Sequence, residues 1–452
     1  MPATIQTTIS VVTPSVSSQK RILFACMPAD GHFNPLTSLA VHLKAAGHDV
    51  RWYTGSIFAK KLAALQIPYL PFKHAQEITV QNIDEVYPQR REIKSQVKKL
   101  SFDICHYFIL RGPEFYADIK EMEQAFPFDI LIADSAFTGI PFVKEKLNKP
   151  VIAVGVTPLT ETSKDLPPAL LGLTPTKGIF GRGKQALQRF LAEKILFREP
   201  NKVMRRVLGA HGIDTGRYNI FDALIQKSTV FLQSGTPGFE YQRSDLSSHI
   251  HFIGPLLPYS ESAYQPLPFL DKLKSYKKVI LVTQGTFEAD SSKLIIPTLE
   301  AYKNSDYLVI VTTAGWHTAE LRAKYPYANC LIEDFIPFSQ IMPLVDVYVS
   351  NGGYGGVLLS IANHLPMVVG GQHEGKNEIC ARVGYFKLGI NLKTETPAQQ
   401  QIKVAVEQVL TNKTYRENVR ALAAEFTQYN APLLCEQYVN QLTGVLPEPS
   451  WN

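Results

Sequence analysis

Short apolar runs alternate with amphipathic stretches along most of the chain, which is the pattern of parallel strands covered by helices. Residues 21–27 (RILFACM) have the pattern of a buried strand. After a short turn, Asn34 and Pro35 predict the cap and the first position of a helix that ends at Gly47. Residues 49–55 then form the returning strand. Such a strand–helix–strand unit predicts a parallel sheet that binds ligands beyond the carboxyl ends of its strands.

The same alternation continues in two separate series. The first series goes on with strands at residues 129–134 and 150–156. The second begins afresh at residues 278–284 and has further strands at 307–313, 345–350 and 366–371. The fold class is therefore predicted to be α/β, with two Rossmann-like, doubly wound parallel-sheet domains.

Changes in composition set the expected domain boundaries. The predicted parts are a flexible N-terminal arm (1–19), a first domain (20–257), a linker that lacks periodicity (258–277), a second domain (278–428) and a C-terminal helix and tail (429–452). The C-terminal part is a candidate for packing back on the first domain.

The composition is that of an ordinary globular protein, with 45% apolar and 19% charged residues among 452. No apolar run reaches the roughly 18 residues of a membrane span, and the first twenty residues lack the order of a signal peptide. Five cysteines without a C-x-x-C pair fit a reducing compartment. We therefore expect a cytoplasmic protein without stable membrane insertion.

The net charge of +6 is too small to indicate a nucleic-acid-binding surface, although it is compatible with an anionic small molecule. Residues 181–209 form a basic, partly amphipathic stretch. A solvated helix face is the favoured interpretation of this stretch, and contact with a membrane surface is the alternative.

The most informative motif is NGGYGG, in which a strand ending at Asn351 is followed by four glycines that lead into a helix. These are Gly352, Gly353, Gly355 and Gly356. Without Cβ atoms, such a turn lets a phosphate or diphosphate approach the backbone N–H groups and the positive end of the helix dipole. The alternative is a tight turn that binds nothing. The motif does not match the G-x-G-x-x-G dinucleotide fingerprint.

One incomplete motif and several absent ones argue against some classes of chemistry. Residues 370–377 (GGQHEGKN) nearly match a P-loop, but Asn377 stands where the Mg²⁺-binding hydroxyl belongs, so nucleotide hydrolysis is not supported. Motifs of the HExxH, EF-hand, G-x-S-x-G and D-x-D types are absent from the sequence. A metal held by paired carboxylates is therefore not expected.

A histidine and an aspartate follow strands of the first series. His32 precedes the first predicted helix, where an imidazole can act as a general base, and Asp134 ends another strand of the same sheet and could orient it. The alternatives are a surface or capping histidine and an aspartate that caps the next helix.

Aromatic-bearing, irregular segments at 72–116 and 158–185 could wall an apolar pocket, although plain core packing competes with this interpretation. The candidate pocket residues are Phe33, Phe102, Phe108 and Phe137.

The stretches MPADGHFNPLTSLAVHLKAAGHDVRWYTG and DFIPFSQIMPLVDVYVSNGGYGG, together with LPMVVGG, resemble the family 1 nucleotide-sugar glycosyltransferases of GT-B fold. The resemblance is to the bacterial macrolide-glycosyltransferase-like branch and covers residues 21–55 and 333–392. It implies an N-terminal acceptor-binding domain and a C-terminal donor-binding domain that face each other across a cleft. It also implies an inverting transfer that needs neither a metal nor another cofactor.

By this resemblance His32 matches the catalytic base of the family and Asp134 the aspartate that supports it. Thr286 resembles the residue that bonds the donor phosphate, and Phe335 falls where a tryptophan usually stacks on the nucleobase. The implied donor-binding residues are completed by Asn351, Gly352, Gly353, Gly355, Gly356, Glu374 and Lys376.

The sequence also departs from the family pattern. Asn351 replaces a common histidine, Gly356 a hydroxyl residue and Leu359 the glutamate that holds the ribose. Residues 374–376 (Glu-Gly-Lys) stand near the position of an Asp-Gln pair. These changes bear on the identity of the donor more than on the type of reaction.

The expected function is inverting, metal-independent transfer of a sugar from a UDP-sugar, or else a dTDP-sugar, to a hydroxyl of an apolar small molecule. The acceptor would be phenolic, flavonoid-like or polyketide-like. The alternatives are a sugar-nucleotide epimerase or hydrolase of GT-B fold and a non-catalytic nucleotide-sugar binding protein. The sequence does not assign the sugar, the nucleotide, the acceptor, the linkage or the oligomeric state.

Overall fold

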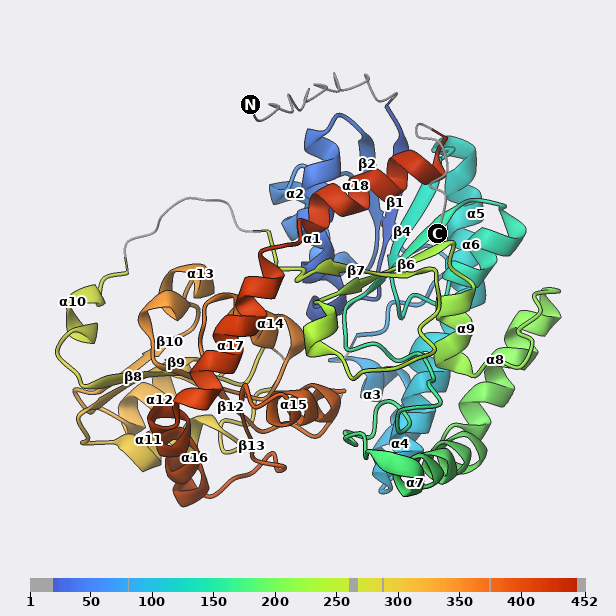
Figure 1. The fold of residues 1–452 in the computed structure, drawn as a ribbon. Helices are drawn as coiled ribbons and strands as arrows, with labels where there is room; N and C mark the ends of the chain where they lie inside the picture. Colours follow the sequence, from blue (N-terminus) through green and yellow to red (C-terminus); the bar gives the residue numbers. More distant parts are fainter. Residues whose placement is uncertain (1–18, 80, 260–266, 287, 374, 445–452) are drawn as a thin grey trace, which may run out of the picture.

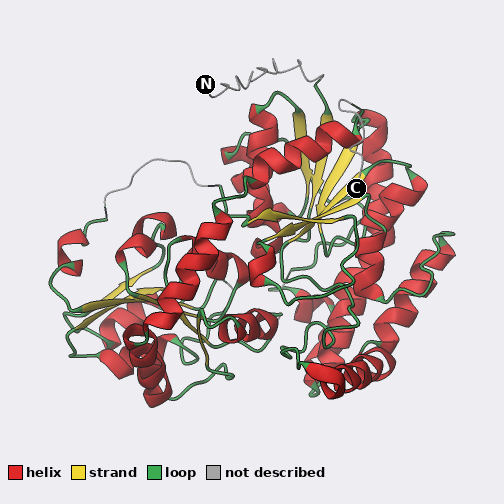
Figure 2. Ribbon diagram, viewed as in Figure 1, coloured by secondary structure: helices red, strands yellow, loops and turns green. Residues whose placement is uncertain are grey.

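The computed structural model describes residues 19–79, 81–259, 267–286, 288–373 and 375–444. They form two α/β units, each built on a parallel sheet, that pack side by side (Figures 1 and 2). Most of the predicted arm, part of the predicted linker, the last eight residues and Glu374 lie outside the described residues.

The first unit has a seven-stranded parallel sheet in the order β3-β2-β1-β4-β5-β6-β7. Alternate residues of one strand enter opposite core layers: Ile22 and Phe24 pack on one face of the sheet, Leu23 and Ala25 on the other. This burial on both faces explains the continuous apolar run. The strands are β1 (Arg21–Ala25), β2 (Asp49–Tyr53), β3 (Tyr69–Leu70), β4 (Ile130–Asp134), β5 (Val151–Gly155), β6 (Val230–Ser234) and β7 (Ile250–Gly254).

Helices cover both faces of this sheet and extend beyond its lower end in Figure 1. They are α1 (Asp30–Ala45), α2 (Ala59–Ala64), α3 (Ile83–Val86), α4 (Gln96–Asp103), α5 (Gly112–Ala125), α6 (Ile140–Lys146), α7 (Gly178–Leu191), α8 (Arg198–Ala210) and α9 (Ile220–Gln226). Two π-helical turns, Ile104–Phe108 and Ala192–Leu196, extend α4 and α7.

The second unit has a six-stranded parallel sheet in the order β10-β9-β8-β11-β12-β13. Its strands are β8 (Lys278–Thr283), β9 (Tyr307–Thr312), β10 (Cys330–Glu333), β11 (Val347–Ser350), β12 (Met367–Val369) and β13 (Gly389–Asn391). Its helices are α10 (Leu270–Leu273), α11 (Ile295–Tyr302), α12 (Thr318–Lys324), α13 (Phe338–Ile341), α14 (Tyr354–Ala362), α15 (Lys376–Tyr385), α16 (Gln399–Thr411) and α17 (Lys413–Phe426).

The last helix, α18 (Ala431–Leu442), leaves the second unit and packs on the first, as the red segment of Figure 1 shows. Its residues Ala431, Cys435 and Val439 join the core layer that contains Ile22. A hydrogen bond of 2.7 Å between His42 Nε2 of α1 and a carboxylate oxygen of Glu436 in α18 adds to this contact. The first unit is therefore completed by the C-terminal end of the described chain.

Both sheets reverse their strand order at one point, between β1 and β4 in the first unit and between β8 and β11 in the second. In open α/β sheets the loops that follow such a pair of strands diverge and leave a crevice for a ligand. The structure thus contains two crevices where sites are expected.

A buried cluster of charges joins the two units. Arg382 of α15 donates to Glu240 of the first unit at 2.8 Å and to Glu378 at 2.8 Å. All three side chains are almost completely buried. Burial alone would lower the pKa of Arg382, but the charges of Glu240 and Glu378 outweigh it and raise that pKa above its ordinary value. The two units are therefore joined by a buried arginine whose charge is paired with two carboxylates.

Two sequence predictions about local structure are wrong. The first helix begins at Asp30 rather than at Pro35, so Pro35 lies inside α1. Asp30 places a negative charge in the first turn, where it interacts favourably with the helix dipole. The aromatic segment 72–116 is not an irregular loop, because much of it folds into short helices that bury their apolar side chains.

Candidate active site

The crevice of the first unit contains His32 and Asp134. His32 lies in the first turn of α1 and Asp134 is the last residue of β4. Because β1 and β4 are neighbours in the sheet, the two side chains meet at its carboxyl edge, and His32 Nδ1 lies 2.7 Å from Asp134 Oδ1. The sequence placed both residues at this edge, and the structure brings them into hydrogen-bonding contact.

The surroundings of Asp134 fix its carboxylate. Its side chain is completely buried and accepts backbone N–H bonds from Met27 at 2.8 Å and from Ala136 at 2.9 Å. The His32 side chain keeps 20% of its surface exposed. The imidazole is therefore held at Nδ1 by a buried carboxylate. Its other nitrogen, Nε2, does not take part in this contact.

Cys26, next to this pair, is the other potentially reactive group in the crevice. Its thiol lies 3.3 Å from Thr54 Oγ1 and accepts a bond of 3.4 Å from the Trp52 indole. Burial, and next the charge of Asp134, raise the pKa of Cys26 well above its ordinary value. Burial and the neighbouring carboxylate thus both disfavour the thiolate form of Cys26.

The crevice of the second unit is formed by the loops after β8 and β11. Gly353 caps α14, so Gly355 and Gly356 lie within its first turn, where helix N–H groups have no partner inside the helix. Gly352 has φ +81°, and a Cβ there would come within 2.5 Å of a thiol sulfur of α15. The Asn351 amide donates to the backbone carbonyl of Gln284, so it links the two loops.

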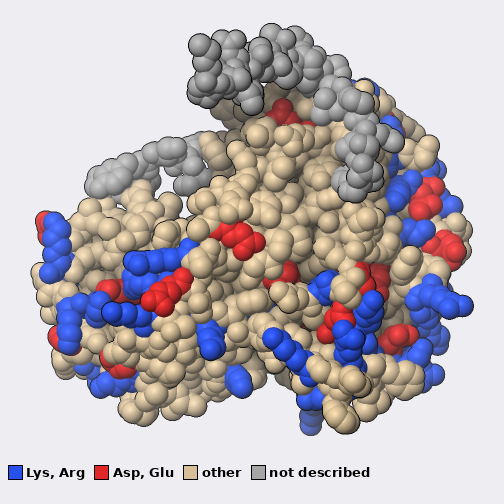
Figure 3. Space-filling view, in the orientation of Figure 1, with Lys and Arg blue, Asp and Glu red and all other residues tan. Residues whose placement is uncertain are grey.

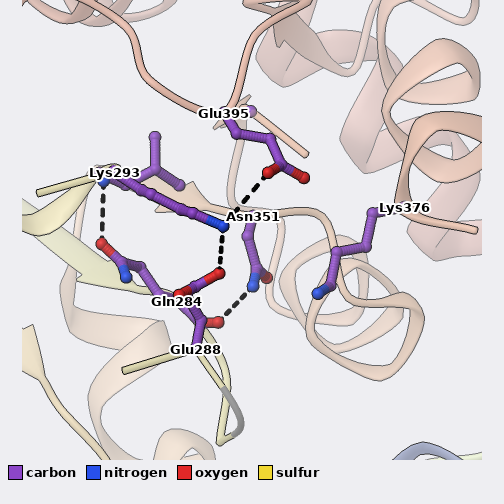
Figure 4. A pocket seen from close by; sticks show the side chains of 8 residues that line it. Gln284, Glu288, Lys293, Asn351, Lys376 and Glu395 are labelled. Carbon is purple, nitrogen blue, oxygen red and sulfur yellow. Dashed lines mark hydrogen bonds and ion pairs between the residues drawn. The ribbon is translucent and has the colours of Figure 1, made fainter. Parts of the chain in front are cut away.

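A pocket of about 230 Å³ opens beside these loops (Figure 4). Lys293 lies between two carboxylates, Glu288 and, at 3.2 Å, Glu395. Lys376 points toward the pocket from α15. Burial alone would raise the pKa of Glu395, but the Gln372 N–H and the neighbouring cations lower it. The lining residues are Gln284, Glu288, Lys293, Leu294, Asn351, Gly370, Lys376 and Glu395.

The two crevices face each other, and a hydrogen bond joins them. Thr286, in the loop after β8, donates from Oγ1 to Asp30 of α1 at 3.2 Å. Asp30 also accepts a bond of 2.6 Å from Lys61. Because Asp30 stands two residues before His32, this contact brings the loop of the second unit to the entrance of the His32–Asp134 site.

Among the other donor-side residues considered from the sequence, Phe335 lies at the same edge of the second sheet. Phe335 follows β10 and is 72% exposed, so its ring is free to receive a planar group. Leu359 is half-buried in α14 and packs against the core. Glu374, the remaining predicted donor-binding residue, lies outside the described residues.

Among the predicted acceptor-pocket residues, Phe33 lies in a different core layer from Phe108 and Phe137, which share one. Phe33 is buried in the core and stacks on Phe58 at 4.1 Å, because one residue along α1 turns it away from His32 toward the sheet. Phe137 is buried and stacks on Phe115. Both rings are core residues in this structure, and their place in an acceptor pocket stays a prediction.

The remaining two candidates are half-buried: Phe102 stacks on His106, and Phe108 packs at the edge of the core. A mainly apolar pocket of about 260 Å³ is found elsewhere in the first unit, between α6, α8 and α9. It is lined by Ile109, Thr138, Pro141, Phe142, Met204, Val207, Leu208, Ile220 and Leu224.

Sequence reasoning missed several residues of the second crevice. Lys293 and Glu395 are 102 positions apart and belong to no motif, so only the fold brings them together. Trp316, 40% exposed, follows β9 and donates from its indole to the Thr286 carbonyl at 3.1 Å. Its position after a strand of the second series was the one signal that could have found it.

Comparisons with known proteins agree with this architecture. Residues 297–441 match the family described as "Erythromycin biosynthesis protein CIII-like, C-terminal domain". The chain is 30% identical to 4'-demethylrebeccamycin synthase of Lentzea aerocolonigenes, over 91% of this chain and 96% of the relative. It is 26% identical to UDP-glucosyltransferase A1 of Starmerella bombicola, over 95% and 94%.

Solved structures show the same fold. The calicheamicin glycosyltransferase CalG4 superposes with a TM-score of 0.72 at 19% identity, covering 94% of this chain and 99% of CalG4. The spinosyn rhamnosyltransferase SpnG, solved with thymidine diphosphate, superposes with a TM-score of 0.64 at 14% identity, covering 93% and 100%. The chain thus belongs to the family 1 glycosyltransferases of GT-B fold, which transfer sugars from nucleotide-sugar donors.

Proposed function

We propose that the protein is an inverting glycosyltransferase that moves a sugar from a nucleoside diphosphate, UDP most of all, to a hydroxyl of an apolar small molecule. The unit that contains residues 20–257 binds the acceptor, and the unit that contains residues 278–428 binds the donor. The observation that carries the proposal is the 2.7 Å contact of His32 with a buried carboxylate, opposite a glycine-rich helix N-terminus.

His32 acts as the general base. The Asp134 carboxylate can only accept a hydrogen bond from Nδ1 of His32. It therefore favours the tautomer of His32 in which Nδ1 carries the proton and Nε2 has the free lone pair. The acceptor hydroxyl gives its proton to Nε2 while its oxygen attacks the anomeric carbon. The buried charge of Asp134 then stabilises the imidazolium that forms.

The donor side stabilises the leaving group. As the new C–O bond forms, the bond between the anomeric carbon and the diphosphate breaks on the opposite face of the sugar, which inverts the configuration. The N–H groups at the start of α14 are donors for the negative charge that develops on the diphosphate. The Thr286 hydroxyl, which donates to Asp30 in this structure, would turn to the diphosphate when the donor binds. Preorganised donors of this kind take the role that a divalent cation has elsewhere, so the proposal includes metal independence.

The sugar and the acceptor belong to opposite sides of the cleft. The pocket beside Lys293, Lys376 and Glu395 offers charged hydrogen-bonding partners for sugar hydroxyls next to the diphosphate. Exposed Phe335 offers a ring on which the nucleobase can stack. The two relatives are named for a rebeccamycin and for UDP-glucose, which supports UDP-glucose as the first donor and a compound of the rebeccamycin type as the first acceptor to try.

The proposal is tested by incubating the protein with UDP-glucose or dTDP-glucose and a panel of phenolic acceptors, with excess EDTA or with Mg²⁺. We expect a glycosylated product whose rate EDTA leaves unchanged, and inverted stereochemistry at the anomeric carbon by NMR. Loss of turnover with EDTA and its return with Mg²⁺ would contradict metal independence. Release of free sugar at the same rate with and without an acceptor would instead identify a hydrolase.

Gly352→Ala is expected to weaken donor binding by about tenfold. A side chain at this positive φ costs roughly 1–2 kcal/mol, and its Cβ would also collide with the Cys380 sulfur, so the loop that positions the α14 amides has to move. The measurement is the dissociation constant of UDP by calorimetry. Gly209→Ala in α8 is the control, since a Cβ there meets nothing within 4 Å and should leave affinity unchanged. Equal affinity of the Gly352→Ala variant and the wild type would remove this loop from the donor site.

A further inference from the structure

Helix α7 and the π-helical turn after it turn their apolar side chains to solvent. Ile179 is 88% exposed and Phe180 96%, and further apolar side chains on this outer surface are 43–71% exposed. We call this surface the α7 face. It consists of Ile179, Phe180, Leu187, Phe190, Leu191 and Ile195.

The inner side of the same helix is polar and is well bonded to the protein. Gln185 is buried, accepts a bond of 2.9 Å from the Thr176 N–H and donates to the Asp165 carbonyl at 3.2 Å. The guanidinium of Arg189 donates to the Leu166 carbonyl. An ordinary surface helix buries its apolar stripe and exposes its polar one. Here the arrangement is reversed, so the helix is held in place while its apolar residues lie outside.

The part of the chain that forms the α7 face and the helix after it is strongly basic. Residues 177–206 contain nine Lys and Arg against two Glu, a net charge of +7, whereas the whole chain carries +6. Lys and Arg side chains gather at the lower right of Figure 3, over the region where Figure 1 places α7 and α8. The charge surplus of the protein is thus concentrated beside its exposed apolar helix.

We propose that the α7 face binds the surface of an anionic lipid bilayer, with the helix lying in the plane of the interface. Apolar side chains would enter the boundary between headgroups and acyl chains, and the surrounding cations would contact lipid phosphates. Within the described residues, no helix has the length and apolar character needed to cross a bilayer. The proposal is therefore for peripheral binding.

The lysines on this surface favour lipid over a protein partner. Lys184 and Lys194 are exposed among the apolar residues of the helix. Lysine is depleted in the cores of protein–protein interfaces, because it would be desolvated there. At a membrane its long side chain reaches up to the headgroups while its methylenes stay in apolar surroundings.

The position of the helix relates this surface to the cleft. Along the segment that leads into α7, Gly172 donates from its N–H to Glu378 of α15 at 2.8 Å, and the Leu170 carbonyl accepts from Asn377 at 2.8 Å. The α7 face therefore continues directly into a segment that contacts the second unit. A bilayer bound there would hold the protein with both units near the surface.

The test is co-sedimentation of the full chain with vesicles of phosphatidylcholine alone or with about 30% phosphatidylglycerol, at about 50 mM and about 500 mM salt. We expect binding to the anionic vesicles at low salt and much weaker binding in the other conditions. In the triple variant Ile179→Ser, Phe180→Ser, Phe190→Ser, the partition coefficient should fall by at least about tenfold. The control Val404→Ser, Leu433→Ser removes exposed apolar side chains from α16 and α18 and should bind like the wild type.

Each outcome decides for or against the proposal. Turnover of a soluble acceptor at the wild-type rate shows that the triple variant is folded. The proposal is overturned if the wild type binds weakly to every vesicle. It is also overturned if binding does not depend on lipid charge and salt concentration. If light scattering finds that the triple variant turns a dimer into a monomer and vesicles do not bind, the α7 face is a self-association surface, and the proposal is equally overturned.

Discussion

Replacing His32 with alanine is expected to lower kcat/KM for sugar transfer by about 10²–10⁴-fold, the usual contribution of a general base. The acceptor hydroxyl then has no group to take its proton, while the donor side of the cleft is unchanged. The measurement combines steady-state kinetics with the dissociation constant of UDP, which should stay at its wild-type value. Retained turnover in the variant would remove His32 from its role as the base.

Asp134→Asn separates the contribution of the carboxylate from that of the imidazole. The amide keeps the size of the side chain but lacks the charge that stabilises the imidazolium, so kcat should fall while acceptor KM changes little. Asp134 also accepts two backbone N–H bonds, from Met27 and Ala136, and an amide can accept at only one of its two atoms. Urea unfolding of the variant therefore accompanies the kinetics, and a rate loss that merely followed the unfolded fraction would argue against the proposed role.

Arg382→Met is expected to destabilise the protein by about 3–5 kcal/mol, because it leaves the carboxylates of Glu240 and Glu378 buried without a cation. The measurement is the urea midpoint of unfolding. In the triple variant that also carries Glu240→Gln and Glu378→Gln no buried charge is left unpaired, so much of this loss should be recovered.

The exposed Arg420 provides the matched control. Arg420→Met removes a guanidinium from α17 and should change the free energy of unfolding by no more than about 0.5 kcal/mol. If the Arg382→Met variant unfolded at the same urea concentration as this control, the buried cluster would not be what holds the two units together.

The sequence predicted much of the fold because the central strands are fully buried. A run such as residues 21–27 has no polar interruption, and this is what a strand covered on both faces requires. The edge strands could not be found in this way. β3 has two residues and β13 three, too few for any periodicity, and pairing with a neighbour alone defines them.

The sequence predicted those residues of the candidate site that directly follow a strand of the sheet. His32 and Asp134 each follow a strand, so topology places them at one edge. Side-chain direction within a helix was not predictable while the start of that helix was assigned to the wrong residue, so the burial of Phe33 against the sheet could not be predicted. The cluster of Lys293 with Glu395 depends on loops that are distant in sequence, and no local pattern marks it.

The return of α18 to the first unit has a consequence for synthesis. Residues 270–426 leave the ribosome with every described strand and helix of the second unit, whereas the N-terminal core still lacks Ala431, Cys435 and Val439. The second unit is in effect an insertion within the first, tethered at both of its ends. The N-terminal unit therefore starts to be made first, but its core can be completed only after α18 has been synthesised.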